Sequence, residues 1–413
     1  MGVTVDCRRY SSGQKPTLNA LISHPKVSAV VQFALLVGGY SLLAAQAQVP
    51  LWRVAPEVRA GTGDGPGALS AVSDVTIGRD GSVYVSQPQE NVVKVYDARG
   101  RYLRSIGREG GGPGEFERPA SLGWRGDTLW VADPPQTRIS LFLPNGRFVR
   151  SISFSRAAPL TDGRPHIPGS LLADGSVLGF WQAPLFVIAG SKPVSVPMVR
   201  FTARGEPIGL LARREDRNEF GVISEGTSRT YFPQPFTDTP LTAVSPDGST
   251  VIIVRRNAAT RPDSTVFSVQ RLRYSGRVTL SRNYQYRPQP LTRERVERAV
   301  DEHVGGLGET RIRTPEAAVL RRQIRQNLYR PHFLPPVTEL VLGRDGTIWL
   351  RREDLGREMA WWHVLDASGR MIARAWVPAG VRVAYADRTQ VWAVEKDELD
   401  VPTLVKYRIV PGG

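Results

Sequence analysis

Residues 81–106 read GSVYVSQPQENVVKVYDARGRYLRSI, and residues 127–152 read DTLWVADPPQTRISLFLPNGRFVRSI. The two stretches align without a gap at a constant offset of 46 residues. In this alignment Val85 matches Val131, and Gly100 matches Gly146. The same segment therefore occurs twice in succession, which indicates a structural repeat.

Each copy of the repeat alternates short runs of β-branched and aromatic residues with turns of the Asp-Gly or Asn-Gly type. Such turns connect neighbouring antiparallel strands, because glycine adopts a positive φ without strain. A repeat of roughly 40–50 residues with this pattern is typical of a propeller blade. Since one blade cannot bury its faces alone, the sequence predicts further blades arranged in a ring.

The same turn, followed by a strand-like run, occurs six times along the chain. The six turns contain Asp80, Gly126, Asp174, Asp247, Asp345 and Asp387. We therefore predict an all-β fold, a six-bladed β-propeller that spans residues 48–413. The last blade is short of an outer strand, and residues 51–58 can supply one, so we expect the first strand to complete the last blade.

The turns at Asp247 and Asp345 lie about 50 residues further apart than one blade requires. Residues 291–332 fill this gap with a different pattern. Thr292 is a suitable N-cap for one helix, and Thr314, followed by a proline, is suitable for a second. We predict a helical hairpin inserted between blades four and five, either as a decoration of the rim or as a lid over one end of the ring.

Residues 1–47 form a leader with its own composition. A basic segment precedes the mostly apolar residues 27–44, and Ala45-Gln46-Ala47 follows as a cleavage pattern. The apolar segment contains Gln32 and is short for a membrane span, so a cleaved signal peptide is favoured over a transmembrane anchor. We expect an exported protein, periplasmic or extracellular, that is soluble after cleavage and has no stable membrane anchor.

The formal net charge of +15 comes from basic residues spread along the whole chain, without any run of five or more like charges. This distribution is typical of a compositional bias rather than of a nucleic-acid-binding surface. The only cysteine is Cys7, in the leader, so the mature chain would have no disulfide and no thiol nucleophile. We expect an acidic partner, no nucleic acid, and a monomer.

Three segments share the order of a known repeat: GPGEFERP at 112–119, LWVAD at 129–133 and RISLF at 138–142. This order resembles the NHL repeat, and the whole chain is similar to bacterial exported six-bladed propellers of the NHL and TolB-like families. The resemblance is specific over about residues 80–155 and diffuse elsewhere. It implies a propeller fold without implying one activity. It also implies that Asp133 and Arg138 fix a turn, through an ion pair or a hydrogen bond.

The sequence offers few combinations of residues for catalysis. The mature chain has four histidines, His166, His303, His332 and His363, and none of them has H-x-H or H-x₃-H spacing. There is no G-x-S-x-G motif and no phosphate-binding loop. We therefore assign no catalytic residue, no metal ligand and no cofactor.

Seven residues are taken as candidate binding residues: Arg118, Trp124, Asp133, Arg138, Tyr329, His332 and Trp361. His332 follows the helical insert and is the first choice among the histidines. Trp361 and Trp362 belong to the third strand of blade five. Since adjacent residues of a strand face opposite ways, one should pack between blades and the other should be partly exposed.

These observations favour a binding or scaffold module, with a protein, peptide or glycan partner, over an enzyme. The alternative is a calcium-dependent hydrolase of the lactonase type, with a carboxylate site at the mouth of the channel. That alternative requires at least three Glu, Asp or Asn side chains at the axis of the ring.

Overall fold

The computed structural model describes residues 49–154, 166–181, 189–263, 265–309, 317–352 and 358–411. The chain divides into two units, Met1–Gln48 and Val49–Gly413, and the described residues all belong to the second. The predicted signal peptide, residues 1–47, lies outside the described residues. None of the helices in the described part of the chain is long and apolar enough to cross a membrane.

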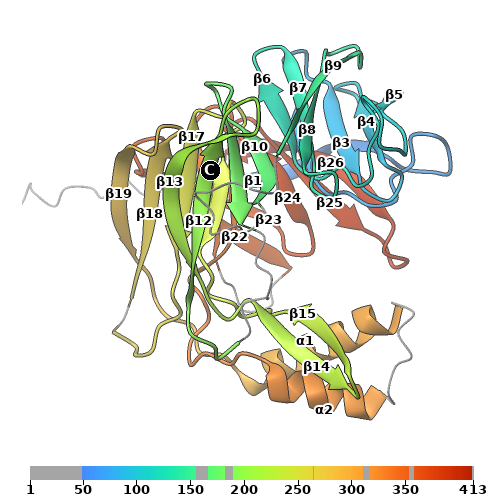
Figure 1. The fold of residues 1–413 in the computed structure, drawn as a ribbon. Helices are drawn as coiled ribbons and strands as arrows, with labels where there is room; N and C mark the ends of the chain where they lie inside the picture. The colour runs from blue at the N-terminus through green and yellow to red at the C-terminus, as the bar shows by residue number, and fades with distance from the viewer. Residues whose placement is uncertain are drawn as a thin grey trace, which may run out of the picture. The chain divides into compact units, whose positions relative to one another are not determined.

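Four separate antiparallel sheets have four strands each, joined in sequence order (Figure 1). The first two consist of β2 (Val75–Ile77), β3 (Val83–Gln87), β4 (Val92–Tyr96) and β5 (Tyr102–Ile106), and of β6 (Leu122–Arg125), β7 (Thr128–Asp133), β8 (Arg138–Phe142) and β9 (Phe148–Ser153). The other two consist of β10 (His166–Leu171), β11 (Val177–Trp181), β12 (Val194–Phe201) and β13 (Pro207–Asp216), and of β16 (Leu241–Val244), β17 (Thr250–Arg255), β18 (Val266–Arg273) and β19 (Val278–Gln285).

The largest sheet has eight strands in the order β20-β21-β22-β23-β1-β26-β25-β24. They are β1 (Leu51–Ala60), β20 (Val337–Leu342), β21 (Ile348–Arg352), β22 (Met359–Leu365), β23 (Met371–Pro378), β24 (Arg382–Ala386), β25 (Gln390–Lys396) and β26 (Pro402–Pro411). β1 pairs antiparallel with β26 from Trp52 to Ala60, as expected of a first strand that completes the last blade.

The all-β prediction and the propeller-like arrangement of sheets are confirmed. The described residues do not, however, form six separate four-stranded sheets. The strands predicted as blades five and six belong to one sheet, because β1 also pairs parallel with β23 over Leu51, Trp52 and Arg53. At these three residues, β1 therefore pairs with a neighbouring strand on both of its edges.

The predicted turns join the first and second strands in every case, and an aspartate side chain stabilises five of the six. The Asp345 carboxylate accepts hydrogen bonds from Thr347 N at 3.1 Å and Thr347 Oγ1 at 2.6 Å. Gly346, between them, has a φ of 79°, a conformation that L side chains rarely adopt. A short Asp-Gly sequence is therefore sufficient to reverse the chain here.

Apolar side chains fill the spaces between neighbouring sheets. Tyr84 and Val95 of one sheet form a buried cluster with Trp124 and Leu129 of the next. Within the eight-stranded sheet, Trp349 and Trp362 are fully buried and lie in one cluster, with ring centroids 6.4 Å apart. The middle strands are therefore buried along almost their whole length, as in β3 and β8, whereas an outer strand such as β19 is mostly exposed.

In each antiparallel sheet, the loops alternate between two ends. The loop between the second and third strands lies at one end. The segment that leaves the fourth strand for the next sheet lies at this same end. We call this end the connection face. It carries residues 61–74, 107–121 and 328–336, whereas the tight Asp-Gly turns lie at the opposite end.

A helical subdomain lies at the connection face. It comprises α1 (Arg293–Glu309), α2 (Ala317–Asn327) and the hairpin of β14 (Phe220–Glu225) and β15 (Ser228–Pro233), which Figure 1 shows beside the helices. The two helices confirm the predicted insert between β19 and β20, while the hairpin was not predicted. The predicted start of the second helix at Thr314 lies outside the described residues.

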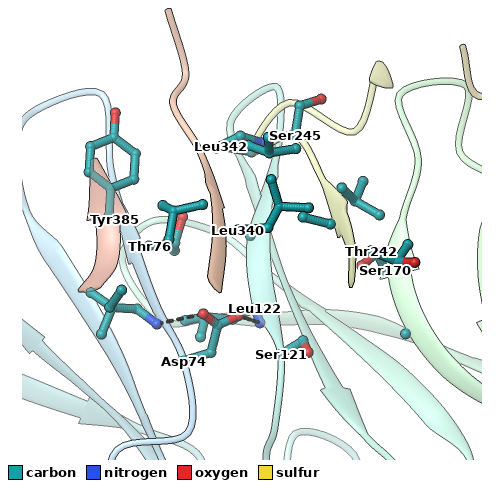
Figure 2. Close-up of a pocket in the computed structure, with 18 of the residues that line it drawn as sticks. Asp74, Thr76, Ser121, Leu122, Ser170, Thr242, Ser245, Leu340, Leu342 and Tyr385 are labelled. Carbon is teal, nitrogen blue, oxygen red and sulfur yellow. Dashed lines mark hydrogen bonds between the residues drawn. The ribbon is translucent and has the colours of Figure 1, made fainter. Parts of the chain in front are cut away.

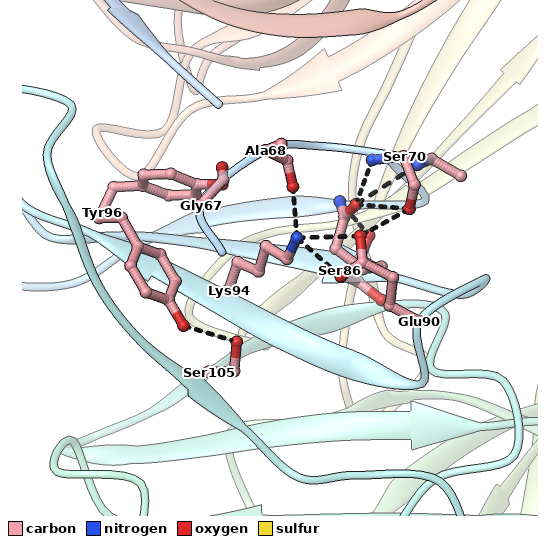
Figure 3. A network of polar contacts seen from close by, with 11 residues as sticks. Gly67, Ala68, Ser70, Ser86, Glu90, Lys94, Tyr96 and Ser105 are labelled. Atoms are coloured by element: carbon pink, nitrogen blue, oxygen red, sulfur yellow. Dashed lines mark hydrogen bonds and ion pairs between the residues drawn. The ribbon is translucent and has the colours of Figure 1, made fainter. Parts of the chain in front are cut away.

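A buried lysine attaches the first connection, residues 61–74, to its sheet (Figure 3). Lys94 is 3% exposed and donates hydrogen bonds to Ala68 O and to the Glu90 carboxylate, which lies 2.7 Å from it. Tyr96 donates to Gly67 O at 2.6 Å. Gln87 Oε1 accepts from Ser70 N at 3.0 Å. These contacts fix the path of the chain from β1 to β2.

The Lys94 contacts predict a measurable loss of stability. We expect Lys94→Met to lower the free energy of unfolding by about 1.5–3 kcal/mol, because the buried hydrogen bonds from a charged group are lost. Equilibrium unfolding in urea measures the change. Lys396→Met is the control: Lys396 makes an exposed ion pair with Asp400, so it should cost about 0.5 kcal/mol or less. Equal losses in both variants would contradict the role of Lys94.

Candidate functional site

The innermost strands of the sheets surround a cavity of about 510 Å³ (Figure 2). Each four-stranded sheet contributes its first strand, namely β2, β6, β10 and β16, and the eight-stranded sheet contributes β20 and β24. We call this space the axial cavity. Segments that are far apart in sequence thus face one another across a single space.

Hydroxyl groups dominate the polar part of the wall. They belong to Thr76, Ser121, Ser170, Thr242, Ser245 and Tyr385. Figure 2 shows Ser121 on the side of Asp74, Ser170 beside Thr242, and Tyr385 and Ser245 toward the other end. The hydroxyl oxygen of Thr242 has no hydrogen-bond partner among the described residues. Tyr385 already donates to Asp387 Oδ2 at 2.8 Å, and Ser245 donates to Asp247 Oδ1. Because hydroxyl groups both donate and accept, the wall suits a polar ligand without charge.

Asp74 is the carboxylate of the cavity wall among the described residues. Its oxygens accept hydrogen bonds from Val75 N at 2.9 Å and from Leu122 N at 3.1 Å. Burial of the carboxyl group raises its pKa to about 6, although both hydrogen bonds and the nearby Arg382 act in the opposite direction. Burial is the larger effect because it penalises the charged form of the acid.

Arg382 supplies the guanidinium of the same wall. It donates to Val72 O at 2.8 Å, within the connection that precedes Asp74. One end of the axial cavity therefore carries a carboxyl group that changes charge near pH 6 and a guanidinium that stays positive.

Apolar residues complete the wall. Leu340 and Leu342 come from β20, and the Phe180 ring lies against Gly169, where an added Cβ would come within 2.3 Å of the ring. Glycine is therefore required at this position for the ring to pack against the inner strand. The combination of apolar surface and a few polar groups is typical of small-ligand sites.

The described part of the wall contains no histidine. Among the described residues there is also no group of three His, Cys, Asp or Glu side chains that could hold a metal ion. The chemistry that the wall offers is hydrogen bonding, together with one titrating carboxyl group.

The structure places Asp133 and Arg138 opposite each other on β7 and β8, where both hold the preceding connection. Asp133 accepts hydrogen bonds from Glu117 N at 2.9 Å and Arg118 N at 3.1 Å. Arg138 donates to Gly111 O at 2.9 Å. The NHL resemblance implied that the two side chains fix the turn between them. Both instead hold the preceding connection through its backbone, and no ion pair joins them among the described contacts.

Arg118 and Trp124 lie in different environments. Arg118 is exposed on the connection 107–121. Trp124 is buried between two sheets, where its ring meets that of Tyr84 edge-on at 5.0 Å. Trp124 thus contributes to packing, and Arg118 remains accessible at the connection face.

Tyr329 and His332 follow α2 in the helical subdomain. Tyr329 N donates to Gln234 Oε1 at 2.7 Å, and burial raises the pKa of the phenol to about 12. His332 is exposed and lines a second cavity, beside α1 and α2. None of the residues described for α1 and α2 lines the axial cavity.

Trp361 and Trp362 follow the predicted alternation. Trp362 is 1% exposed and belongs to the core, whereas Trp361 is partly exposed and packs edge-on against Trp376 at 4.7 Å. The seven candidate residues therefore do not form one site.

The sequence analysis missed Asp74 and the hydroxyl groups of the axial cavity. Their only signal was their position, because each lies on or directly beside an inner strand that precedes a turn of the repeat. Because Ser, Thr and Asp are common in turns and loops, these residues carried no motif of their own.

No known protein family matches the sequence, and no curated protein matches it. Among solved structures, a member of the DUF4221 family from Bacteroides vulgatus is 9% identical to this chain, with a TM-score of 0.49. The alignment covers 88% of this chain and 100% of the solved chain. Regucalcin, a calcium-binding protein from Agrobacterium tumefaciens, is 12% identical to this chain, with a TM-score of 0.39. The alignment covers 87% of this chain and 96% of the regucalcin chain.

Virginiamycin B lyase from Staphylococcus aureus is 11% identical to this chain, with a TM-score of 0.38. The alignment covers 87% of this chain and 100% of the lyase chain. Likenesses as distant as these carry no argument about activity. The propeller-like arrangement of the sheets rests on the strand pairing itself.

The raised pKa of Asp74 predicts a pH-dependent contribution to stability. The folded protein holds the proton of the Asp74 carboxyl group more tightly than the unfolded chain does. The resulting contribution to the free energy of unfolding is complete below about pH 4 and is lost as the pH rises to about 6. We expect wild type to lose about 1–2 kcal/mol relative to Asp74→Asn across this range, after allowance for solvent screening.

Unfolding in urea at a series of pH values measures this difference. Asp74→Asn loses one N–H···O hydrogen bond. This loss shifts its plot of unfolding free energy against pH by a constant and does not change the slope. Parallel curves between pH 4 and 7 would contradict the raised pKa.

Proposed function

We propose that this chain is an exported, six-bladed binding module, and that its axial cavity holds a polar part of a peptide or glycan partner. The observation that carries the proposal is the wall of the cavity, in which hydroxyl groups from several inner strands surround one carboxyl group and one guanidinium. A partner could contact the connection face while a polar group enters the cavity.

Strand pairing supports the assignment of six blades. β20–β23 would form the fifth blade, and β24–β26 with β1 the sixth. The parallel contact between β1 and β23 involves three residues, whereas the antiparallel contact between β1 and β26 extends from Trp52 to Ala60. The longer pairing would define the blade, and the shorter one would join two blades.

The composition of the wall favours recognition of a hydrogen-bonding ligand. Hydroxyl groups are compact and adaptable, and they match sugar hydroxyls as well as peptide amides. Asp74 accepts only two backbone hydrogen bonds, so its oxygens keep further capacity to accept. A ligand N–H or O–H group could use that capacity.

The calcium-dependent hydrolase of the lactonase type remains the alternative. It would require at least three oxygen-bearing ligands at the axis, and the described wall contains Asp74 as its carboxylate. This composition favours the binding module. Thermal unfolding with calcium and with a chelator separates the two, since a calcium site would raise the melting temperature with calcium alone.

Blocking the axial cavity tests the proposal. Wild-type protein is screened on peptide and glycan arrays, and the best ligand is measured by calorimetry. We expect Ser121→Phe and Ser170→Phe to weaken binding at least a hundredfold, because each ring would occupy space in the cavity. Ser281→Phe, at an exposed position of β19, is the matched control and should bind like wild type. Unchanged binding in both cavity variants would refute the axial site.

Export is tested separately. The leader of residues 1–47 predicts a mature protein that begins near Gln48, outside the membrane. Intact-mass measurement of the protein from periplasmic and culture fractions of a bacterial host would show the cleaved species. A full-length chain retained in the membrane fraction would indicate an uncleaved anchor instead.

A further inference from the structure

The two helices of the helical subdomain run antiparallel. Glu297 of α1 pairs with Arg325 of α2, and Asp301, one turn later in α1, pairs with Arg321, one turn earlier in α2. The start of α1 and the end of α2 therefore lie at the same end of the helix pair. The chain returns to this end after α2, where Leu291 N donates to His332 O at 3.1 Å.

A cavity of about 720 Å³ opens at this end. Its wall comes from the first turns of α1, the last turns of α2 and residues 330–332. We call it the helical cavity. None of its lining residues belongs to the axial cavity, so the two sites are separate.

The lining of the helical cavity is strongly basic. It contains the guanidinium groups of Arg293, Arg325 and Arg330 and the imidazole of His332, with Glu297 as its carboxylate. Arg293 and Arg330 are exposed, so both side chains can reach a ligand.

The carboxylate of Glu297 is already engaged. It accepts two hydrogen bonds from Arg325, at 3.1 Å from Nε and 2.5 Å from Nη2, and this pairing lowers its pKa. Arg293 and His332 line the same space beside this paired acid, as does Arg330, whose Nη2 donates a hydrogen bond to Arg325 O. The local balance of charge is therefore positive.

The floor of the helical cavity is built on a packed core. Val296, which lines it, belongs to a buried cluster with Ile324 and Leu328 of the α2 side and Phe232 of the β15 strand. Gln234 donates to Asn327 O at 2.7 Å and ties the hairpin to the end of α2. The basic side chains thus project from a supported surface, which reduces the entropy that a ligand must overcome.

We propose that the helical cavity binds a ligand with two or more carboxylate groups. Guanidinium groups form paired hydrogen bonds with carboxylates. Arg325 is already paired with Glu297, and the other two guanidinium groups come from different segments, Arg293 from the start of α1 and Arg330 from the chain after α2. A single phosphate ion would fill only a small part of a cavity of this size. The separated arginines match an extended polyanion, either a free polycarboxylate or the acidic segment of a peptide.

Calorimetry at low ionic strength tests this assignment with citrate, a tetraglutamate peptide and inorganic phosphate as probes. We expect citrate or tetraglutamate to bind more tightly than phosphate, and the double variant Arg293→Gln/Arg330→Gln to weaken that binding at least tenfold. Tighter binding of tetraglutamate identifies a peptide segment as the natural ligand, and tighter binding of citrate a small molecule.

Two controls make the test specific. Arg322→Gln removes an exposed arginine of α2 that does not line the cavity, so it should change affinity less than twofold. Arg293→Lys/Arg330→Lys keeps the charge without the paired hydrogen bonds, and should lose part of the affinity. Equal weakening by Arg322→Gln, or no binding of citrate and tetraglutamate by wild type, would overturn the proposal.

The result is independent of the proposed function. Ser121→Phe and Ser170→Phe change the axial cavity alone, so they should leave citrate and tetraglutamate binding unchanged. Far-ultraviolet circular dichroism and thermal unfolding check that each variant is folded, and exposed arginines are replaced with little effect on stability.

Discussion

The pairing of β1 with β26 is the interaction on which the arrangement of the sheets depends. It brings a strand from the start of the described chain into the sheet built by its end. Backbone hydrogen bonds along this pair cover the outer edge of β26, and exposed edges are where sheets fray or aggregate. The same strand contacts β23, so the final two groups of strands become one continuous sheet.

The inner strands derive their role from this closure. Each is short and is buried on its outer side by the next strand, while its inner side faces the axial cavity. The wall is therefore assembled from pieces that are distant in sequence. Asp74 illustrates the result: a carboxyl group at the start of one strand accepts a hydrogen bond from Leu122 of the neighbouring sheet, and burial there changes its acidity.

Much of the fold could be predicted from the sequence, because Asp-Gly turns and alternating strands act locally. The positions of all six turns, the helices and the first strand followed from such patterns. The β14–β15 hairpin did not, since its buried side chains Ile223 and Phe232 share a cluster with residues of α1 and α2, far away in sequence. The sites were harder still: Asp133 carried a motif and supports a loop, whereas Asp74 and Arg293 carried none and line cavities.

The helical subdomain has a mechanical consequence. Its hairpin interrupts the connection from β13 to β16, and its helices interrupt the connection from β19 to β20. The chain therefore passes between the subdomain and the sheets four times, twice in each direction. A part held at a single pair of crossings can swing as a hinge, but two pairs oppose that rotation. Any ligand of the helical cavity would thus meet arginines on a subdomain whose rotation against the sheets is opposed at both pairs of crossings.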